Sequence, residues 1–321
     1  MAKPTPVTME FLVEHIRNKN FETEEELQNY LSSIIGKSMD EIIKNDNSPK
    51  MKALQLIEKA KAERSDKKCL KYINEALALD PDNADAYLML ANLADDEANY
   101  LTLVEKAVDA GKRAIGDEFD ALKGEFWANA QTRPYMRAVA RKADILRGND
   151  RVDEAIVLYQ SLIKLNPNDN QGIRDLLAPL LILTNRKSEY KKLQKKFLED
   201  ESLSFYICDA FLAWEEAPKS PHTADAFKDM FMRNAFLAEV LFDASNLEPE
   251  LPEAYQIGSP EEALFSIYTC GFLFATIDEK LSKLIIKVIQ PIADDIDLLQ
   301  EKWFQYQLDD TKIKFLVSTV H

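Results

Sequence analysis

The chain has 321 residues, of which 46% are hydrophobic, 30% are charged and only eight are glycine. This composition excludes a largely disordered chain, and the length exceeds that of one ordinary core, although stacked repeats do not need a single core. The formal net charge of -15 and the pI of about 4.8 disfavour binding to nucleic-acid phosphates or to anionic membranes.

No stretch reaches the roughly 18 apolar residues that a membrane-spanning helix needs, and no charged segment followed by an apolar one opens the chain. We therefore expect a soluble, cytoplasmic protein that binds no membrane. The cysteines and histidines are scattered at Cys69, Cys208, Cys270, His15, His222 and His321. Because none of them has a second ligand at metal-binding spacing, we expect reduced thiols, no metal site and no cofactor.

The first 49 residues carry several helix signals. Residues 8–18 place apolar side chains on one helical face. Thr23 with Glu26 and Ser38 with Glu41 form two capping boxes, in which a hydroxyl and a carboxylate bind free N–H groups at a helix start. We expect a helical cap that closes the apolar end of the repeats that follow.

Residues 50–83 and 136–169 both fit a 34-residue helix-turn-helix repeat pattern. In the second of these, Ala143 and Ala155 are the small residues that let two helices approach closely. Pro167 then ends the second helix, because the residue before a proline is pushed out of the α region. In the first repeat, the corresponding large, small and proline positions hold Leu56, Cys69, Ile73, Ala76 and Pro81.

Each of these repeats is followed by another first helix, over 84–94 and 170–183, whose partner helix is degenerate. Residues 97–130 form an insertion between the repeats. We predict that it contains one long helix and then a shorter one that carries Phe126 and Trp127.

Beyond the repeat core at 50–199, residues 200–321 keep helical periodicity but lose the repeat signature. Ser259 and Pro260 make a strong helix start. For the β-branched run at 314–320 we favour helix over strand, because no partner strand is evident. The other predicted elements are a loop at 246–257 and helices over 203–217, 223–242, 261–276 and 281–290.

Residues 50–199 resemble the tetratricopeptide superfamily. The segments EKAVDAGKRAIG (105–116), FWANAQTRPYMRA (126–138) and LNPNDNQGIR (165–174) look more closely like a group of bacterial tetratricopeptide proteins related to suppressor of tumorigenicity seven. That similarity extends from about residue 22 to 275. It implies an all-α fold, a right-handed superhelix of helical hairpins, and transfers no catalytic residues.

Repeats of this kind bind extended peptides in a concave groove lined by the first helix of each pair. Arg133, Arg137 and Arg141 follow one another every four residues and make a basic ridge, and Arg174 lies early in the next repeat. The planar guanidinium groups of such arginines can bind a carboxylate through two parallel hydrogen bonds. The alternative is that they pair with acidic residues of neighbouring helices and hold the repeats in register. These acidic residues would be Asp144, Asp175 and Glu125.

Asn92, Asn129 and Trp127 are further candidates for the same groove, the asparagines as hydrogen-bonding groups and the tryptophan as an anchor. A basic run at 186–196 is interpreted as a solvated face, because a nucleic-acid site needs a wider basic surface. Aromatic residues at helical spacing are usually core. Those in the C-terminal half are Phe227, Phe231, Phe236 and Phe242.

We therefore predict a non-catalytic scaffold that binds a partner protein or peptide through an acidic or C-terminal carboxylate segment. The partner-binding residues would be Arg137, Arg141, Arg174, Asn92, Asn129 and Trp127. One alternative is a regulator or chaperone that holds one specific protein, such as a secreted factor, through the C-terminal helices. Another is an enzyme with a site in the C-terminal half, although no phosphate loop, nucleophile elbow or HExxH motif is present.

Overall fold

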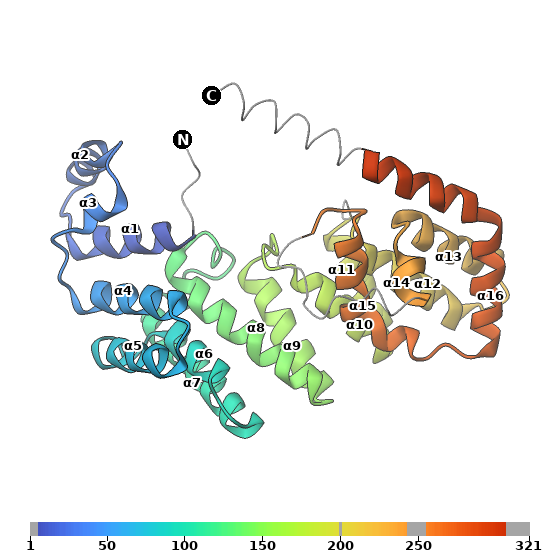
Figure 1. Cartoon of the computed structure of the whole chain (residues 1–321), viewed down its shortest axis with the longest axis horizontal. Coiled ribbons are helices and arrows are strands. Elements are labelled where there is room, and N and C mark those ends of the chain that lie inside the picture. Colours follow the sequence, from blue (N-terminus) through green and yellow to red (C-terminus); the bar gives the residue numbers. More distant parts are fainter. Residues whose placement is uncertain (1–5, 199–200, 243–254, 306–321) are drawn as a thin grey trace. The chain divides into compact units, whose positions relative to one another are not determined.

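The computed structural model describes residues 6–198, 201–242 and 255–305, and these residues form helices and turns without any strand (Figure 1). The all-helical prediction is confirmed. The chain divides into two compact units, Met1–Gln171 and Gly172–His321. The pair of helices that follows residue 171 therefore belongs with the C-terminal helices, although its sequence groups it with the repeats.

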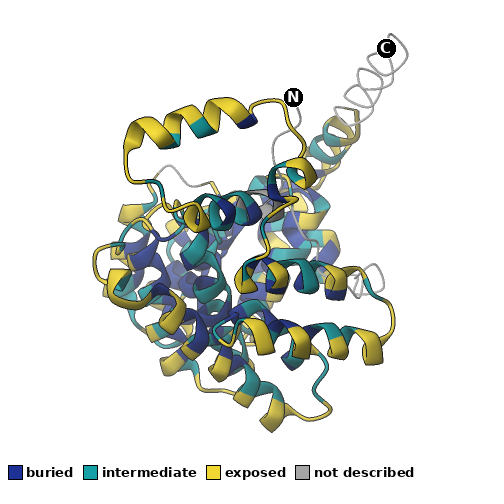
Figure 2. Cartoon of the chain, turned by 90° about the vertical axis from the view of Figure 1, so that its left-hand side faces the viewer, coloured by how far each residue is buried: buried dark blue, intermediate teal, exposed yellow. Residues whose placement is uncertain are grey.

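Unit 1 begins with α1 (Pro6–Asn18), α2 (Glu24–Ile34) and α3 (Met39–Ile43). Helices start at both predicted caps. Ser38 and Glu41 form the full capping box, whereas the Glu26 carboxylate accepts from the backbone N–H of Glu22 rather than from that of Thr23. The helix α2, at the top of Figure 2, buries only Ile34 among its residues. It therefore adds little to the core of this unit.

Three helical hairpins follow, and within each one the two helices pack against each other, while α7 also packs against α8. In order, the helices are α4 (Pro49–Ala62), α5 (Asp66–Leu79), α6 (Ala84–Asn92), α7 (Glu97–Ile115), α8 (Arg133–Gly148) and α9 (Val152–Leu165). The helices α5 and α9 end two residues before Pro81 and Pro167, as the prolines predict. Ala143 and Ala155 are completely buried, which fits a close contact between α8 and α9.

The predicted short helix around Phe126 and Trp127 is wrong. After α7 the chain forms a 3-10 turn, η1 (Gly116–Phe119), then irregular turns and a second 3-10 turn, η2 (Ala130–Thr132). The N–H groups of Gly124 and Phe126 both donate to the carbonyl oxygen of Leu165, at 3.1 and 3.2 Å. These bonds, and the burial of the Phe126 ring, favour a turn over the helix.

The helices α7 and α8 approach each other closely at Gly111. A Cβ atom at this position would lie 2.9 Å from the Cα of Tyr135 and 3.2 Å from its backbone nitrogen. Only a residue without a side chain fits there, because the obstructing atoms include the backbone of α8.

We expect Gly111→Ala to destabilise the chain by about 1–3 kcal/mol, since α8 must move to accept the methyl group. Gly148→Ala is the matched control: it lies in α8, and nothing is within 4 Å of its added Cβ. Urea unfolding of both variants measures the difference. Equal midpoints would mean that α7 and α8 are not in contact at Gly111.

Unit 2 contains seven α-helices in its described part, followed by a 3-10 turn, η4 (Gln290–Ile292), and a helical stretch over 293–305. The helices are α10 (Ile173–Leu183), α11 (Lys187–Lys196), α12 (Leu203–Glu216), α13 (Pro221–Arg233), α14 (Leu237–Phe242), α15 (Pro260–Phe274) and α16 (Glu279–Ile289). Most of the predicted loop at 246–257, and all of the run at 314–320, lie outside the described residues.

The segment 223–242 is broken at Asn234 rather than forming one helix. The Asn234 side chain accepts from the N–H of Phe236 and donates to the carbonyl of Ser259 and to the carboxylate of Glu262, at 2.9 and 3.0 Å. Glu262 is buried and also accepts from the N–H groups of Gly258 and Leu203, at 2.6 and 3.2 Å. One carboxylate thus links α12, the α13–α14 junction and the start of α15.

The aromatic residues of this unit follow the prediction with one exception. Phe227, Phe231 and Phe236 are buried, but Phe242 is 63% exposed at the end of α14. The buried stripe continues past the break at Asn234, because Phe236 lies beyond it, and the stripe ends before Phe242, the last residue of α14.

Candidate functional site

The first helices of the three hairpins in unit 1 share a surface on which α1 lies. We call this surface the first-helix face and define it by α4, the start of α6, η2 and α8. It is lined by Leu54, Ile57, Ala84, Asp85, Pro134 and Arg137. The helix α1 packs against α4 and η2, and its side chains reach α8.

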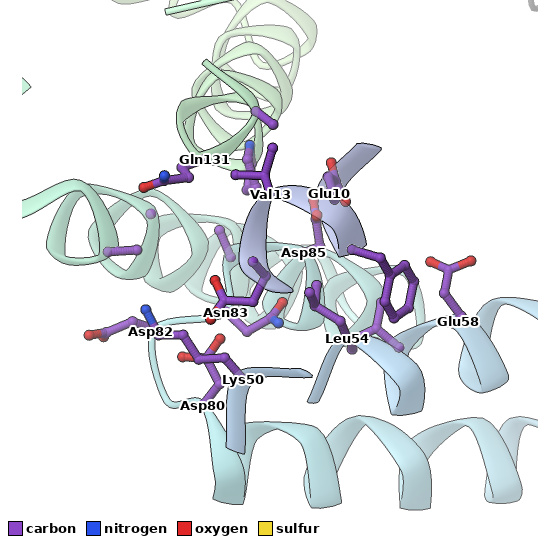
Figure 3. A pocket seen from close by; sticks show the side chains of 18 of the residues that line it. Glu10, Val13, Lys50, Leu54, Glu58, Asp80, Asp82, Asn83, Asp85 and Gln131 are labelled. Atoms are coloured by element: carbon purple, nitrogen blue, oxygen red, sulfur yellow. The ribbon is translucent and has the colours of Figure 1, made fainter. Parts of the chain in front are cut away.

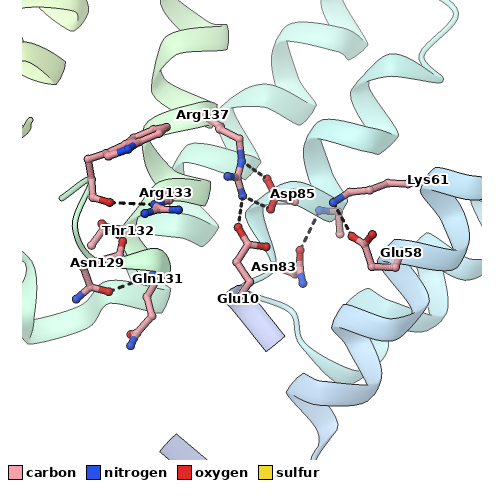
Figure 4. A network of polar contacts seen from close by, with 12 residues as sticks. Glu10, Glu58, Lys61, Asn83, Asp85, Asn129, Gln131, Thr132, Arg133 and Arg137 are labelled. Atoms are coloured by element: carbon pink, nitrogen blue, oxygen red, sulfur yellow. Dashed lines mark hydrogen bonds and ion pairs between the residues drawn. The ribbon is translucent and has the colours of Figure 1, made fainter. Parts of the chain in front are cut away.

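The central charge on this face is Arg137. Its Nε and Nη2 atoms donate to the two carboxylate oxygens of Asp85, at 3.0 and 2.6 Å, and Nη2 also donates to Glu10 of α1 at 3.2 Å (Figure 4). The bidentate geometry makes Asp85 the stronger partner. Because one cation meets two carboxylates, the three side chains carry a net charge of -1 when all are ionised.

This excess of negative charge affects Glu10. Burial raises the pKa of its carboxyl above the ordinary 4.5, and the nearby Asp85 raises it further, whereas Arg137 and Lys61 only partly oppose the shift. The ionised form of Glu10 is therefore less stable on the first-helix face than in water, in spite of its contact with Arg137.

We expect Glu10→Gln to raise the urea midpoint of unfolding at pH 7. A carboxyl whose pKa is higher in the folded chain binds an extra proton on folding, so its contribution to stability falls as pH rises from 4.5 through the folded pKa. The advantage of the variant should grow across that window and then level off. A less stable Gln variant at pH 7 would mean that the attraction to Arg137 outweighs burial.

The other end of α1 is anchored by hydrogen bonds. His15 is buried, its Nδ1 donates to Asp46 at 2.8 Å, and its Nε2 lies 2.7 Å from the hydroxyl of Tyr30. Asn18 donates to Ser48, which is the N-cap of α4. Burial would raise the pKa of Asp46, but hydrogen bonds from His15, Ser48 and Asn18 lower it overall. This end of α1 is thus fixed to the start of α4.

Between these two ends, α1 does not fill the first-helix face. A cleft of about 110 Å³ remains on this face, and its lining includes Glu10, Phe11 and Val13 of α1 and Leu54 and Ile57 of α4. Figure 3 shows Glu10, Val13 and Leu54 around it. Such a volume is several times what one water molecule needs. Apolar residues and charged residues both line the cleft, so it can accept an apolar side chain next to a charge.

The acidic residues around the cleft already have basic partners within the repeats. Glu58 accepts from Lys61 at 2.7 Å, Asp82 accepts from Arg113 at 2.7 Å, and Asp85 is held by Arg137. Lys50 lowers the pKa of Asp80, although burial raises it overall. The floor of the cleft is therefore close to neutral without α1.

The residues predicted to form one binding groove make separate contacts in the structure. Arg133 donates to the carbonyl of Trp127 at 2.9 Å, and its guanidinium lies 5.0 Å from the centre of the Trp127 ring. Arg141 is exposed and donates to the hydroxyl of Tyr100 at 2.7 Å. These contacts hold the turn before α8 and the start of α7, respectively.

The remaining predicted residues do not join Arg137 within unit 1. Asn129 caps η2 by accepting from the N–H of Gln131, and Asn92 is exposed at the end of α6. Arg174 belongs to unit 2, where its guanidinium lies 5.4 Å from the centre of the Phe197 ring.

Sequence reasoning missed both partners of Arg137. Asp85 is the second residue of its repeat, as Arg137 is of its own, so a comparison of equivalent positions in successive repeats would have paired them. No comparable signal exists for Glu10, because it comes from the cap rather than from a repeat.

The basic run on α11 is partly neutralised by the next helix. Lys187 lies 3.4 Å from Glu215, and Lys191 lies 3.8 Å from Glu216. These exposed pairs contribute little stability. They nevertheless reduce the positive charge that α11 presents, which supports the interpretation of this run as a solvated face.

Within residues 6–198, 201–242 and 255–305, no cluster of three or more His, Cys, Asp or Glu side chains is placed to hold a metal ion. None of the helices in the same ranges combines the length and the apolar character needed to span a bilayer. Comparison of the whole chain with protein-family models and with curated proteins finds no match.

Proposed function

We propose that this chain is a non-catalytic scaffold of the tetratricopeptide type, and that the first-helix face of unit 1 binds a carboxylate-bearing segment of a partner protein. The observation that carries this proposal is α1 itself. An amphipathic helix lies on the face, presents a carboxylate to Arg137 and packs Phe11 beside Met51 and Ile43. The face therefore has the chemistry to hold a helical segment of this pattern.

The contacts of Arg137 change how the proposal has to be tested. Reversing Arg137, Arg141 and Arg174 together would not leave the melting temperature unchanged, as a purely exposed ridge predicts, because Arg137→Glu would place three carboxylates together. A pair of charge-neutralising variants separates binding from stability. Arg137→Gln removes the cation and both of its ion pairs, whereas Asp85→Asn removes one carboxylate and leaves Arg137 paired with Glu10.

We expect Arg137→Gln to be the more destabilised variant, because it leaves two carboxylates together without a cation, and we expect the two variants to move partner binding in opposite directions. Arg137→Gln should weaken capture, whereas Asp85→Asn should strengthen it by removing the carboxylate that takes two of the Arg137 donors. Capture by the wild-type chain should weaken as salt rises, since exposed charges are screened over roughly 8 Å at physiological ionic strength. Equal capture by both variants would place the binding site elsewhere.

Chemical cross-linking of the captured partner locates the contact directly. Lys50 and Lys61 line the cleft, so cross-links to them support the first-helix face. Cross-links to Lys280, Lys283 and Lys287 on α16 would instead support a regulator or chaperone that works through the C-terminal helices. Half-exposed apolar side chains favour that second candidate. They are Ile286, Leu298 and Phe304.

A further inference from the structure

The helix α1 occupies the surface that a partner would need. Glu10 takes a hydrogen bond from Arg137, and Phe11 is buried in a cluster with Ile43 and Met51. The Nη2 atom of Arg137 is the nitrogen that donates to Glu10, and the same atom also donates to Asp85. A partner carboxylate at the same place would therefore compete with Glu10 for a single donor.

Two features make α1 an imperfect ligand of this face. Val13 leaves the cleft of about 110 Å³ unfilled by side chains, so a larger apolar side chain at its position would gain van der Waals contacts with the apolar residues that line the cleft. Glu10 and Glu14 also line a cleft whose own charges are already paired. A helix with a larger apolar side chain at the position of Val13, and with one carboxylate instead of two, would fit the same surface better.

We propose that α1 is an internal, displaceable occupant of the first-helix face, and that the partner is an amphipathic helix which replaces it. This inference rests on the proposed function. The partner helix presents a carboxylate to Arg137 and, three residues later, an apolar side chain larger than valine to the cleft. Residues three apart in an α-helix are separated by nearly one turn, so their side chains lie on the same face.

Tethering gives α1 an advantage that a partner must overcome. A segment held by a short linker competes at an effective concentration of the order of millimolar. The apparent association constant of the partner is then its intrinsic value multiplied by the fraction of chains in which α1 is released. The hydrogen bonds of His15 and Asn18 keep one end of α1 at the start of α4. We therefore expect α1 to detach from the face at the end that carries Glu10.

The test uses the full chain and a fluorescent synthetic peptide of residues 6–18 in which Val13 is replaced by leucine. Phe11→Ala in the chain releases α1, and Ile35→Ala, which removes an exposed apolar side chain outside α1, is the control. We expect the peptide to bind Phe11→Ala at least about tenfold more tightly than the wild type or Ile35→Ala. Adding Arg137→Gln to the released chain should abolish that gain.

Each other outcome is informative. Equal binding to the wild type and to Phe11→Ala, with loss on Arg137→Gln, would overturn the inference and leave the proposed function standing. No binding to either folded chain would reject the first-helix face as a helix site, and with it the proposed function. A concentration-dependent dimer of Phe11→Ala, seen by light scattering, would show a second copy as the occupant and overturn the partner helix.

Circular dichroism checks that Phe11→Ala keeps its helix content. If it does not, Val13→Asp replaces it as the releasing variant, because it sets a charge over the cleft and leaves Phe11 in place. The same comparison with the wild type and with Arg137→Gln then decides the question by the same criteria.

Discussion

Ala155→Arg is expected to unfold the hairpin of α8 and α9, and Ala143→Arg to do the same from the opposite helix. Both alanines are completely buried where these helices pack together. An arginine at either site must displace its neighbours and leave a charge buried without a partner. Together these effects should lower the free energy of unfolding by about 3–5 kcal/mol.

Val157→Arg is the matched control for this prediction. Val157 lies on the same helix as Ala155 but is 60% exposed, so an arginine there meets water. Its urea midpoint should stay close to that of the wild type, while the two alanine variants unfold much earlier. Alanine variants that melt within a degree or two of the wild type would show that α8 and α9 do not meet at these positions.

Glu262→Ala is expected to have the other large effect. Its carboxylate accepts from the N–H of Leu203, the N–H of Gly258 and the side chain of Asn234, and the residue is almost fully buried. Truncation leaves the buried N–H of Leu203 and one buried N–H of the Asn234 amide without an acceptor, and it removes the acceptor of the half-buried Gly258 N–H. Each orphaned buried donor costs about 1–3 kcal/mol, so the two buried donors alone should cost about 2 kcal/mol or more.

Two variants control for side effects at the start of α15. Glu261→Ala removes the neighbouring carboxylate, which is exposed, and should change stability little. Glu262→Gln keeps the volume but has one acceptor oxygen instead of two, so its loss should be intermediate. Peptide-resolved hydrogen exchange should place the damage of Glu262→Ala in unit 2. A stable Glu262→Ala chain would mean that water reaches these donors.

Local signals in the sequence predicted much of the fold. The hydroxyls of Ser38 and Ser259 accept from backbone N–H groups at helix starts, and Pro81 and Pro167 lie just past helix ends, because caps and prolines act within one turn of the chain. The prediction of a helix around Phe126 was wrong for the opposite reason. Its conformation depends on the carbonyl of Leu165, which is 39 residues away along the chain.

The candidate site was predicted less completely than the fold. Arg137 was singled out by its place in a repeat, yet its partners Asp85 and Glu10 are 52 and 127 residues away. Periodicity shows which face of a helix a side chain occupies, but not which distant segment covers that face. The role of α1 therefore became visible only in three dimensions.

The Glu262 carboxylate also has a consequence for how unit 2 folds. The bond from Leu203 spans 59 residues and that from Asn234 spans 28, so the chain must close long loops before this carboxylate is satisfied. Loop closure of this kind slows folding, whereas the neighbouring hairpins of unit 1 can form from local contacts. In a ribosome-bound chain that ends before α15, we expect unit 1 to be largely folded and unit 2 to be incompletely folded.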